Sequence, residues 1–519
     1  MPQLQRRLSF FSLVMAVVTS TIGSGWLFAP YLSAQLAAGA SLLSWVLGGL
    51  MSFLLALVFA ELGALVSSSG ALAQIPLLTH GRAAGFLGGW ASWLGYVAIP
   101  AIEVLATVQY LGSSLPWLTR DGGAGEVLSG WGLLVASLLL VLFAWINLAG
   151  VGVLARWIEG LTIWKLVVPL TVSVALISRA AHWDNLAIGG GQSGGVLAAL
   201  GTGGILFSLL GFRTAMDLAG EARRPQRDVP LAMALGLGIS LAIYLVLQLA
   251  FLVAVPPAEL SQGWHALRLT AHGGPLVAVA LSLGFGGLAT LLLTDAVISP
   301  SGTAMAYMAT AARLNWMLSH CRLLPAPFAH INRAGVPSVA LIASLVIGLL
   351  ALLGGPSWQG VVGFVTAAMV ISLAIGPVSL EALRRQAPQL DRPFRLPWAP
   401  LLCPLTFVLA SWAIVWCGWT SLRLAVPLVL LPALLFVLLR RGRTVELGGC
   451  LWWFVYLGGL SLIAWLGTPT ARPLLPPLPQ LAVAALFALA VFPLAVRSRL
   501  QVPSPYAMLD LDAPNSPCP

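Results

Sequence analysis

The stretch VVTSTIGSGWLFAP, which runs from Val17 to Pro30, interrupts an apolar segment close to its middle. Two glycines flank Ser24, a tryptophan follows at once, and a proline closes the stretch. Glycine and proline are the weakest helix formers, so a segment apolar enough to cross a membrane carries its helix breakers at mid-depth. Irregular backbone at that depth is tolerated only where it lines a cavity or is buried within protein. The stretch therefore predicts a membrane helix that is broken where polar backbone groups are needed.

The composition of the whole chain agrees with a membrane setting. Of its 519 residues, 59% are hydrophobic and only 8% are charged, and the mean hydropathy is +0.95. A soluble domain carries about 25% charged residues, so a soluble fold is excluded. The net charge of +10 does not indicate nucleic-acid binding, because the arginines are scattered singly and in pairs between apolar runs.

The five cysteines and six histidines predict neither a metal centre nor a catalytic site. No two cysteines form a CxxC pair, and Cys403 and Cys417 fall within apolar runs, so we expect no disulfide framework and no metal. All six histidines fall in predicted loops. We accordingly expect a protein that is not an enzyme and that binds no cofactor.

Apolar segments long enough to cross the hydrocarbon core need roughly 20 residues each, and by this rule the chain has about fourteen. They cover residues 11–37, 41–66, 84–115, 127–149, 156–178, 196–220, 231–255, 274–300, 336–354, 358–380, 399–419, 424–440, 448–467 and 479–496. The sequence thus predicts an all-α polytopic membrane protein. The segment TAMAYMATAARL, which follows residue 301, predicts a separate short helix along the membrane surface.

These spans divide the chain into four parts. Residues 1–10 are expected to form a cytoplasmic N-terminus, and residues 11–380 a ten-helix transport core. Four accessory helices follow over residues 399–496. The Pro-rich residues 497–519 predict a disordered cytoplasmic tail.

The arginines predict the orientation of the chain. With a cytoplasmic N-terminus, nineteen arginines fall in cytoplasmic segments and five in external ones. The positive-inside rule then places both termini in the cytoplasm. A composition rich in arginine, alanine, glycine and leucine is typical of bacterial genes of high GC content, which favours the bacterial inner membrane.

A second broken helix lies in the run GTGGILFSLLGFRTAMDLAGE, residues 201–221, where Gly203, Gly204 and Gly211 precede the charged Arg213. The first and sixth spans correspond if residues 11–178 and 196–380 form two five-helix repeats. A glycine pair alone more often reflects close helix packing, but breaks at matching places in inverted repeats point to a transporter binding site. Freed N–H groups suit a carboxylate and freed C=O groups suit an ammonium. An α-amino acid carries both.

Six motifs in register resemble the amino acid–polyamine–organocation (APC) superfamily of transporters. They are TIGSGWLFAP at 21–30, AEL at 60–62, FSLLGFRTAMDLAGEARRPQRDVP at 207–230, ISPSGT at 298–303, LLPAPFAHINRAGVPSVALI at 323–342 and RPFRLP at 392–397. The resemblance covers roughly residues 8–440. It implies a leucine-transporter-like core of five plus five inverted-repeat helices, with discontinuous first and sixth helices. It also implies a proton-coupled or exchange carrier of amino acids, closest to the aspartate–proton symporters.

The resemblance assigns a binding site to the two breaks. The first unwound segment, which would bind the substrate carboxylate through N–H groups, is implied to comprise Ile22, Gly23, Ser24 and Gly25. The second, whose carbonyls would take the ammonium, is implied to comprise Phe207, Ser208, Leu209, Leu210 and Gly211. Phe207 would act as an aromatic lid. Many family members have a Tyr-Glu pair in place of Leu209-Leu210 and a glutamate in place of Arg213, which leaves the substrate's side chain open.

Lys165 is the strongest candidate for proton coupling, because it is the only lysine in the chain and lies well inside the fifth span. An intramembrane charge is a functional candidate by default. A buried lysine can release its proton near neutral pH, whereas arginine cannot. In the family a fifth-helix lysine can replace the sodium ion of sodium-coupled relatives. We therefore expect Lys165 to be the proton switch rather than a lysine that reaches the interface.

The remaining buried charges are assigned by position. Asp295 is expected near the inner end of the eighth span, where it either pairs with Lys165 or caps a helix end, and Glu103 is expected to relay protons or face the substrate path. Glu61 is expected to pair with a cytoplasmic arginine as a structural or gating contact.

Two more carboxylates lie close to arginines. Asp217 and Glu221, with Arg223, Arg224 and Arg227, predict an inner gate or a salt-bridge cluster, and the alternative is a solvated face. Arg213 either faces the cavity, where it would favour aspartate or glutamate, or points to the vestibule and pairs with Asp217 at i+4.

The sequence thus favours a secondary active transporter of acidic or neutral amino acids, coupled to protons and working by alternating access as a monomer or homodimer. An exchanger of the same fold and a sensor that does not transport are the alternatives. A channel would show a filter motif and an enzyme a polar constellation within the spans, and neither is present in the sequence. Its expected partners are the amino acid, protons and the lipid bilayer.

Overall fold

The computed structural model describes residues 8–66, 68, 70–112, 114–121, 126–189, 194–269, 274–353, 358–439, 447–468 and 474–503. The predicted disordered tail lies mostly outside these residues. The described chain is almost wholly helical, and its one described sheet is the short antiparallel pair β1 (Thr119–Asp121) and β2 (Glu126–Leu128). The expected all-α architecture is confirmed.

The α-helices follow the predicted order of apolar runs. They are α1 (Phe10–Thr21), α2 (Gly25–Ala37), α3 (Ser41–Leu65), α4 (Ala71–His80), α5 (Arg82–Leu111), α6 (Gly130–Leu148), α7 (Val151–Arg179), α8 (Gly195–Gly201), α9 (Ile205–Leu209), α10 (Thr214–Asp217), α11 (Pro225–Ala254), α12 (Pro275–Ser282), α13 (Gly286–His320), α14 (Ser338–Leu352), α15 (Trp358–Gln386), α16 (Ala399–Trp416), α17 (Gly418–Leu439), α18 (Leu451–Leu466) and α19 (Pro477–Arg497).

Within the described residues, ten helices are long and apolar enough to cross a membrane, or eleven if the bent pair α8 and α9–α10 is one span. Three further apolar helices, α1, α14 and α18, are shorter. The chain is therefore a polytopic membrane protein, while the count of fourteen spans stays a prediction.

The eighth span differs from its prediction. The structure divides the region into the short α12 and the 35-residue α13, which continues to His320 with Pro300 inside it. The segment that was expected to form a separate surface helix is the second half of α13. Almost every residue of that half is buried, so packing against neighbouring helices carries the helix past the proline.

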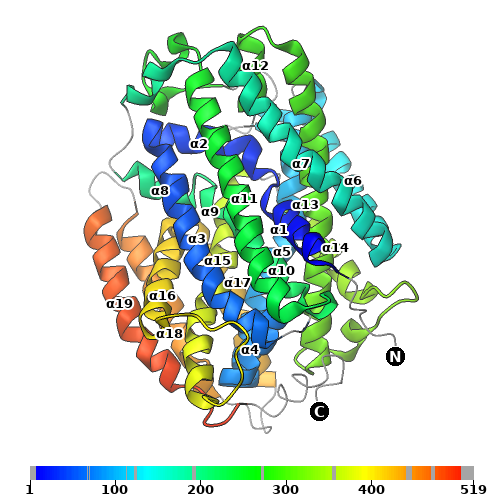
Figure 1. The fold of residues 1–519 in the computed structure, drawn as a ribbon, viewed down its shortest axis with the longest axis vertical. Coiled ribbons are helices and arrows are strands. Elements are labelled where there is room, and N and C mark those ends of the chain that lie inside the picture. Colours follow the sequence, from blue (N-terminus) through cyan, green and yellow to red (C-terminus); the bar gives the residue numbers. More distant parts are fainter. Residues whose placement is uncertain are drawn as a thin grey trace.

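The core is a bundle of long helices in which α5 packs against both α13 and α15, and α3 packs against α11. Figure 1 shows α3 and α11 running along the long axis of the molecule. The two broken helices lie beside each other, because α1 contacts α10 while α2 contacts α8 and α9. The first half of one thus meets the second half of the other, so the two run in opposite directions, as two inverted repeats require.

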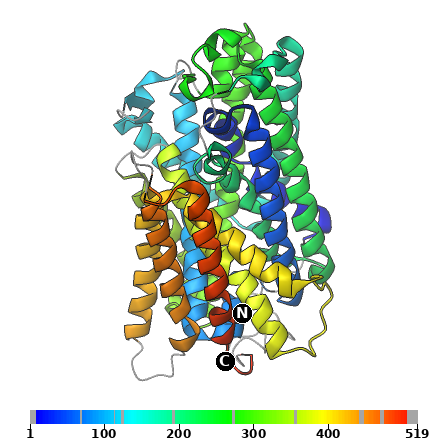
Figure 2. The same ribbon diagram turned by 90° about the vertical axis from the view of Figure 1, so that its left-hand side faces the viewer.

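The accessory helices α16–α19 gather on one side of the core, in orange and red in Figure 2. α16 joins them to the core through α15 and α3, and α17 joins through α5. Outward-facing apolar side chains are exposed, including Leu138, Val174 and Leu486. Such a surface fits a molecule whose surroundings are lipid rather than water.

The two ends of the bundle are named here by the helices that mark them. The α4 face holds α4 and both ends of the described chain, since Leu8 pairs with Ala222 and the Leu500 amide bonds to Thr79. The α12 face is the other end of the bundle (Figure 1).

Candidate functional site

The first break lies where the sequence predicts it. α1 ends at Thr21 and α2 begins at Gly25, so residues 22–24 are not helical. Ile22 leaves the helix with φ −92° and ψ 88°. Gly25, which was expected within the unwound segment, is instead the first residue of α2. The break exposes the carbonyl end of α1 and the amide end of α2 at one place.

Lys165 on α7 bonds to the free carbonyl groups at the end of α1. Its Nζ donates to the carbonyl oxygens of Thr19 at 2.9 Å and Ile22 at 2.7 Å, and to Thr303 Oγ1 at 2.6 Å. The side chain is fully buried. All three ammonium protons therefore have acceptors, and the positive charge lies at the negative end of the α1 dipole.

Two neighbouring hydroxyls complete the same end. Thr303 Oγ1 on α13 lies 2.8 Å from the Thr19 carbonyl oxygen, to which it can donate, and the hydroxyl of Tyr244 on α11 donates to the Thr21 carbonyl at 2.9 Å. Three different helices thus supply the partners that the missing helical turn would have provided.

Glu103 on α5 closes the amide side of the break. Its Oε2 accepts the backbone N–H of Ser24 at 2.7 Å, and its Oε1 accepts the Ser24 hydroxyl at 3.1 Å. The carboxylate is buried and lies at the positive end of the α2 dipole. A Cβ at Gly23 would come 2.7 Å from Glu103 Oε1, so glycine is what lets the carboxylate approach the backbone this closely.

Trp358, at the start of α15, is a site residue that the sequence reading missed. Its Nε1 donates to Ser24 Oγ at 2.8 Å. Its ring stacks on Phe28 at 4.8 Å and meets Phe207 edge-on at 5.9 Å. Phe207, which was expected to act as a lid by itself, thus lies in a group of rings from three helices. Nothing in the sequence near Trp358 marks it as a partner of Ser24.

The second break lies earlier than expected. The helix bends by 54° between Gly201 and Ile205, where Gly204 adopts a left-handed conformation with φ +84° that glycine accepts without strain. The prediction of an unwound Phe207–Gly211 is wrong in part. Phe207, Ser208 and Leu209 are helical in α9, and Leu210 begins the 3-10 turn Leu210–Arg213. Ser208 Oγ accordingly bonds to the Gly204 carbonyl at 2.8 Å.

The two breaks touch each other. A Cβ at Gly25 would meet Ser208 Oγ at 2.1 Å, and one at Gly211 would meet Thr21 Oγ1 at 2.4 Å. The structure therefore brings together the residues assigned to both segments, including the buried Leu209 and Leu210.

Arg213 lies toward the α4 face from this meeting point. Its Nη1 donates to Ser372 Oγ at 2.5 Å and to the Met369 carbonyl at 3.2 Å, and its guanidinium covers the Tyr96 ring at 4.6 Å. The Tyr96 hydroxyl donates to Asp217. The alternative of a direct Arg213–Asp217 pair is wrong, because Tyr96 lies between their charges and no ion pair joins them among the described residues.

The buried charge of Arg213 is only partly satisfied. Its Nε and Nη2, and Oδ1 of Asp217, have no hydrogen-bond partner among the described residues. A buried cation without an anionic partner is expensive. Two donors of this buried guanidinium are thus unsatisfied within the described residues.

Asp295 does not pair with Lys165 as one alternative expected. Its Oδ1 accepts the indole N–H of Trp164 at 2.6 Å, and no described ion pair joins it to the lysine. The expected position near the inner end of the eighth span is also wrong, because α13 extends to His320 and places Asp295 in the third turn of the helix.

Glu61 pairs with arginines on the α4 face, as its sequence position suggested. Its two oxygens accept from Arg384 at 2.5 and 3.0 Å, from Arg392 at 3.1 Å and from the Leu396 amide at 2.7 Å. One fully buried carboxylate on α3 thus joins α15 to the segment that follows it.

Glu221 pairs with a different arginine from those expected. Its carboxylate receives Arg313 Nε at 2.6 Å and Nη2 at 3.4 Å, and none of Arg223, Arg224 and Arg227 forms a described ion pair. Those three follow Glu221 in the chain, but the long α13 brings Arg313 against it. The expectation of a local cluster with Asp217 is wrong for this reason.

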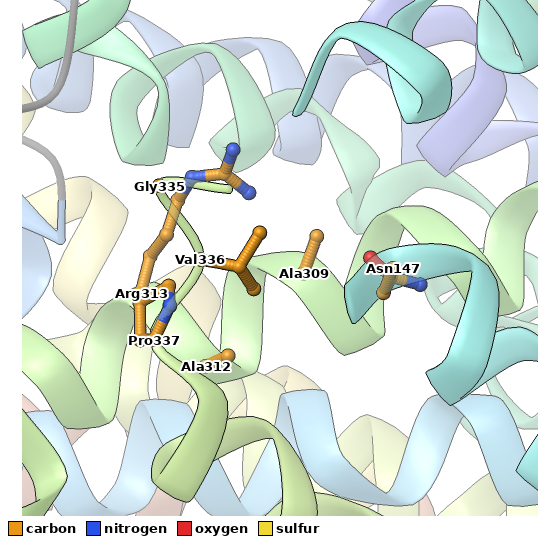
Figure 3. A pocket seen from close by; sticks show the side chains of 7 residues that line it. All are labelled: Asn147, Ala309, Ala312, Arg313, Gly335, Val336 and Pro337. Atoms are coloured by element: carbon orange, nitrogen blue, oxygen red, sulfur yellow. The ribbon is translucent and has the colours of Figure 1, made fainter. Parts of the chain in front are cut away.

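A small pocket lies beside this pair, away from the two breaks. Its lining is Asn147, Ala309, Ala312, Arg313, Gly335, Val336 and Pro337. Figure 3 shows these side chains, which come from α6, α13 and the segment before α14. None belongs to the unwound segments, so the pocket is separate from the candidate site.

The bundle thus contains two broken helices that run in opposite directions and meet at their breaks, and buried charges bond to the free ends of the first. This arrangement is typical of secondary transporters. Comparison with known proteins places the chain within that class. Residues 8–439 match the family model described as amino acid permease, and the chain belongs to this family, within the APC superfamily. It is a multi-pass membrane protein of amino acid transport and not an enzyme.

Named relatives cover most of the chain. It is 33% identical to the glutamate/serine transporter AimA of Bacillus subtilis over 486 residues. These aligned residues cover 90% of this chain and 89% of the relative. It is 34% identical over 421 residues to the aspartate-proton symporter of the same organism, with 80% of each covered. A methylthioribose transporter of that organism is 23% identical over 429 residues, which cover 79% of this chain and 88% of the relative.

Proposed function

We propose that this protein is a proton-coupled importer of acidic amino acids that binds its substrate between the two breaks. The observation that carries the proposal is the first break itself, with Lys165 on its carbonyl side and Glu103 on its amide side. A transporter needs polar groups at mid-depth that can exchange partners. The free carbonyls and the free amide of the first break are such groups, and Lys165 and Glu103 bond to them.

The substrate's backbone groups suit the break. Its α-carboxylate would take the amide end of α2 at Ser24, where the helix dipole favours an anion. Its ammonium would take carbonyl oxygens at the second break, residues 202–204, where Gly204 lies against the Trp358 ring.

Arg213 supports the choice of an acidic side chain. Tyr96, which it covers, precedes Glu103 by seven residues on α5, or roughly 10 Å along the helix. At that distance and an effective dielectric constant near 20, the attraction between the Arg213 cation and a side-chain carboxylate of the substrate would be about 1.7 kcal/mol. The names of the two relatives, a glutamate/serine transporter and an aspartate-proton symporter, point in the same direction.

Lys165 is proposed as the proton switch. When protonated it bonds two carbonyls of the first break, and on losing a proton it would give up one of these bonds and loosen the α1 end. Asp295, which accepts from Trp164 beside Lys165 in the chain, would tune the charge near this switch. The arginine distribution supports an α4 face that lies in the cytoplasm.

The test is uptake of radiolabelled aspartate, glutamate, serine, leucine and arginine into proteoliposomes. An inward proton gradient should drive accumulation of aspartate or glutamate, and a protonophore should abolish it. Liposomes without protein are the control. Uptake seen only after preloading with amino acid would instead make the protein an exchanger, and binding without any flux would make it a sensor.

A further inference from the structure

The Glu103 carboxylate occupies the position that a substrate carboxylate would need. Its Oε2 accepts the Ser24 N–H at 2.7 Å and its Oε1 accepts the Ser24 hydroxyl at 3.1 Å. These are the donors at the amide end of α2 that would bind an α-carboxylate. The side chain is 1% exposed, so the contact is an interior one.

We propose that Glu103 is a built-in competitor of the substrate, and that an amino acid binds only when Glu103 takes up a proton and releases the Ser24 amide. The inference rests on the proposed function. It adds to that function a specific proton site and a reason for coupling.

The reason is electrostatic. Two ionised carboxylates cannot share one buried site, because like charges in a low-dielectric interior disfavour the ionised form of one of them. A protonated Glu103 can turn its O–H toward the incoming carboxylate and donate to it. One proton then enters with each amino acid, and no covalent bond changes. The proton (+1) balances the net charge of aspartate or glutamate (−1), so the total charge of the site is unchanged on binding.

Neighbouring contacts hold the competitor in place. The Trp358 indole N–H donates to Ser24 Oγ, which leaves the hydroxyl proton directed at Glu103. The same tryptophan packs against Phe207. Release of Glu103 therefore frees the Ser24 hydroxyl beside the aromatic lid, where the substrate would lie.

The other titratable groups that face Glu103 are Lys165 on α7, Tyr244 on α11 and Tyr307 on α13. Tyrosines ordinarily titrate near pH 10, outside the range tested below. Lys165 is the one alternative source of a pH dependence. The competing bonds, however, belong to Glu103, so the two groups can be separated by mutation.

The experiment measures aspartate and glutamate binding to the full chain in nanodiscs by calorimetry between about pH 5.5 and 8, a range that brackets neutral pH. For the wild type we expect the affinity to fall with rising pH, by up to about tenfold per unit, with one proton taken up per ligand. Glu103→Gln removes the competing charge, so its affinity should be independent of pH. Exposed Glu259, replaced by Gln, is the matched control and should behave as the wild type.

A pH slope that survives in Glu103→Gln overturns the proposal and assigns the slope to Lys165. A flat wild-type profile with measurable binding also overturns it but leaves amino acid transport intact. No binding and no uptake by the wild type would refute the proposed function itself. If Glu103→Gln does not fold, Glu103→Asp, which is one methylene shorter and falls short of the Ser24 amide, should bind more tightly than the wild type at high pH. Unchanged binding in that variant counts against the competitor role.

Discussion

At the scale of the residue, one lysine stands among 25 arginines, and the structure gives that lysine a place no arginine could fill. Lys165 Nζ has three acceptors within 2.9 Å, and a Cβ added at Gly302 would meet its Cε at 3.1 Å. The space accepts a compact ammonium but not a planar guanidinium. A lysine can also lose its proton, which an arginine cannot.

Lys165→Arg should therefore abolish proton-driven accumulation of substrate in proteoliposomes. The permanent charge cannot be released, and the larger group disturbs the Thr19 and Ile22 carbonyls. Arg179→Lys at the exposed end of the same helix is the control and should leave uptake unchanged. Accumulation of substrate by Lys165→Arg under an inward proton gradient, at the level of the wild type, would refute the switch.

Arg213→Met should change substrate preference rather than remove transport. Loss of the cation should raise the KM for aspartate and glutamate roughly 20-fold, which follows from about 1.7 kcal/mol of lost attraction. The KM for serine should stay the same, because serine carries no side-chain charge. Equal changes for all three substrates would show that Arg213 supports the fold only. Competition assays in proteoliposomes give the ratio.

The sequence could identify the residues of the first break but not their partners. Gly23 and Ser24 stand out because weak helix formers within an apolar run are a local signal. Trp358 lies 334 residues from Ser24 and Thr303 lies 138 residues from Lys165, and no local pattern relates them. The second break cannot be located from the sequence alone, because several glycines lie between residues 201 and 211. Only the backbone shows that Gly204 lies at the bend.

At the scale of the element, the end of α4 is held by the end of α19. His80 Nδ1 lies 2.8 Å from Thr79 Oγ1, and its Nε2 lies 3.1 Å from the Ala495 carbonyl. Gln386 bridges the carbonyls of Thr79 and Leu500. The neutral imidazole satisfies both of its contacts, and burial lowers the pKa of His80 to about 4.

This depressed pKa predicts an acid-sensitive contact between α4 and α19. The stabilisation is fully present above the ordinary histidine pKa near 6.5 and is lost as the pH falls toward 4, by up to about 3 kcal/mol. The midpoint of thermal unfolding, followed by tryptophan fluorescence, should drop over this range more steeply in the wild type than in His80→Gln. Parallel profiles would show that His80 has no part in the acid response.

The long helices could be predicted as elements, whereas their ends could not. The length of each apolar run identifies the helices. A proline such as Pro300 favours the end of a helix, but packing against neighbouring helices lets α13 continue to His320. The partners of Glu221 were misassigned for the same reason, because the extra turns of that helix bring Arg313 to it.

At the scale of the whole molecule, buried contacts lie on both sides of the proposed substrate site. On the α4 face, Glu61 joins α3 to Arg384 and Arg392, and Glu221 pairs with Arg313. Toward the α12 face, Trp358 and its neighbouring rings cover Ser24. Alternating access requires these two sets of contacts to open in turn.

Glu221→Gln should favour opening on the α4 face. It leaves Arg313 buried and unpaired, and breaking a buried pair costs about 3–5 kcal/mol. Hydrogen exchange over residues 214–221 should become faster. Glu381→Gln is the matched control, because its partner Arg385 is 50% exposed and such pairs contribute about 0–1 kcal/mol. Equal exchange in the two variants would exclude Glu221 from the gate.

The contact between His80 and Ala495 joins two segments that are synthesised at different times. The two residues are 415 positions apart, and α4 leaves the ribosome long before α19. Until the last helix is inserted, the imidazole and the Thr79 carbonyl lack their partners on that helix and on Leu500. Without α19, the Thr79 carbonyl would keep only the Gln386 amide among its described partners, and His80 Nε2 would lose the Ala495 carbonyl. A variant that lacks α19 is therefore expected to unfold at a lower temperature than the full chain.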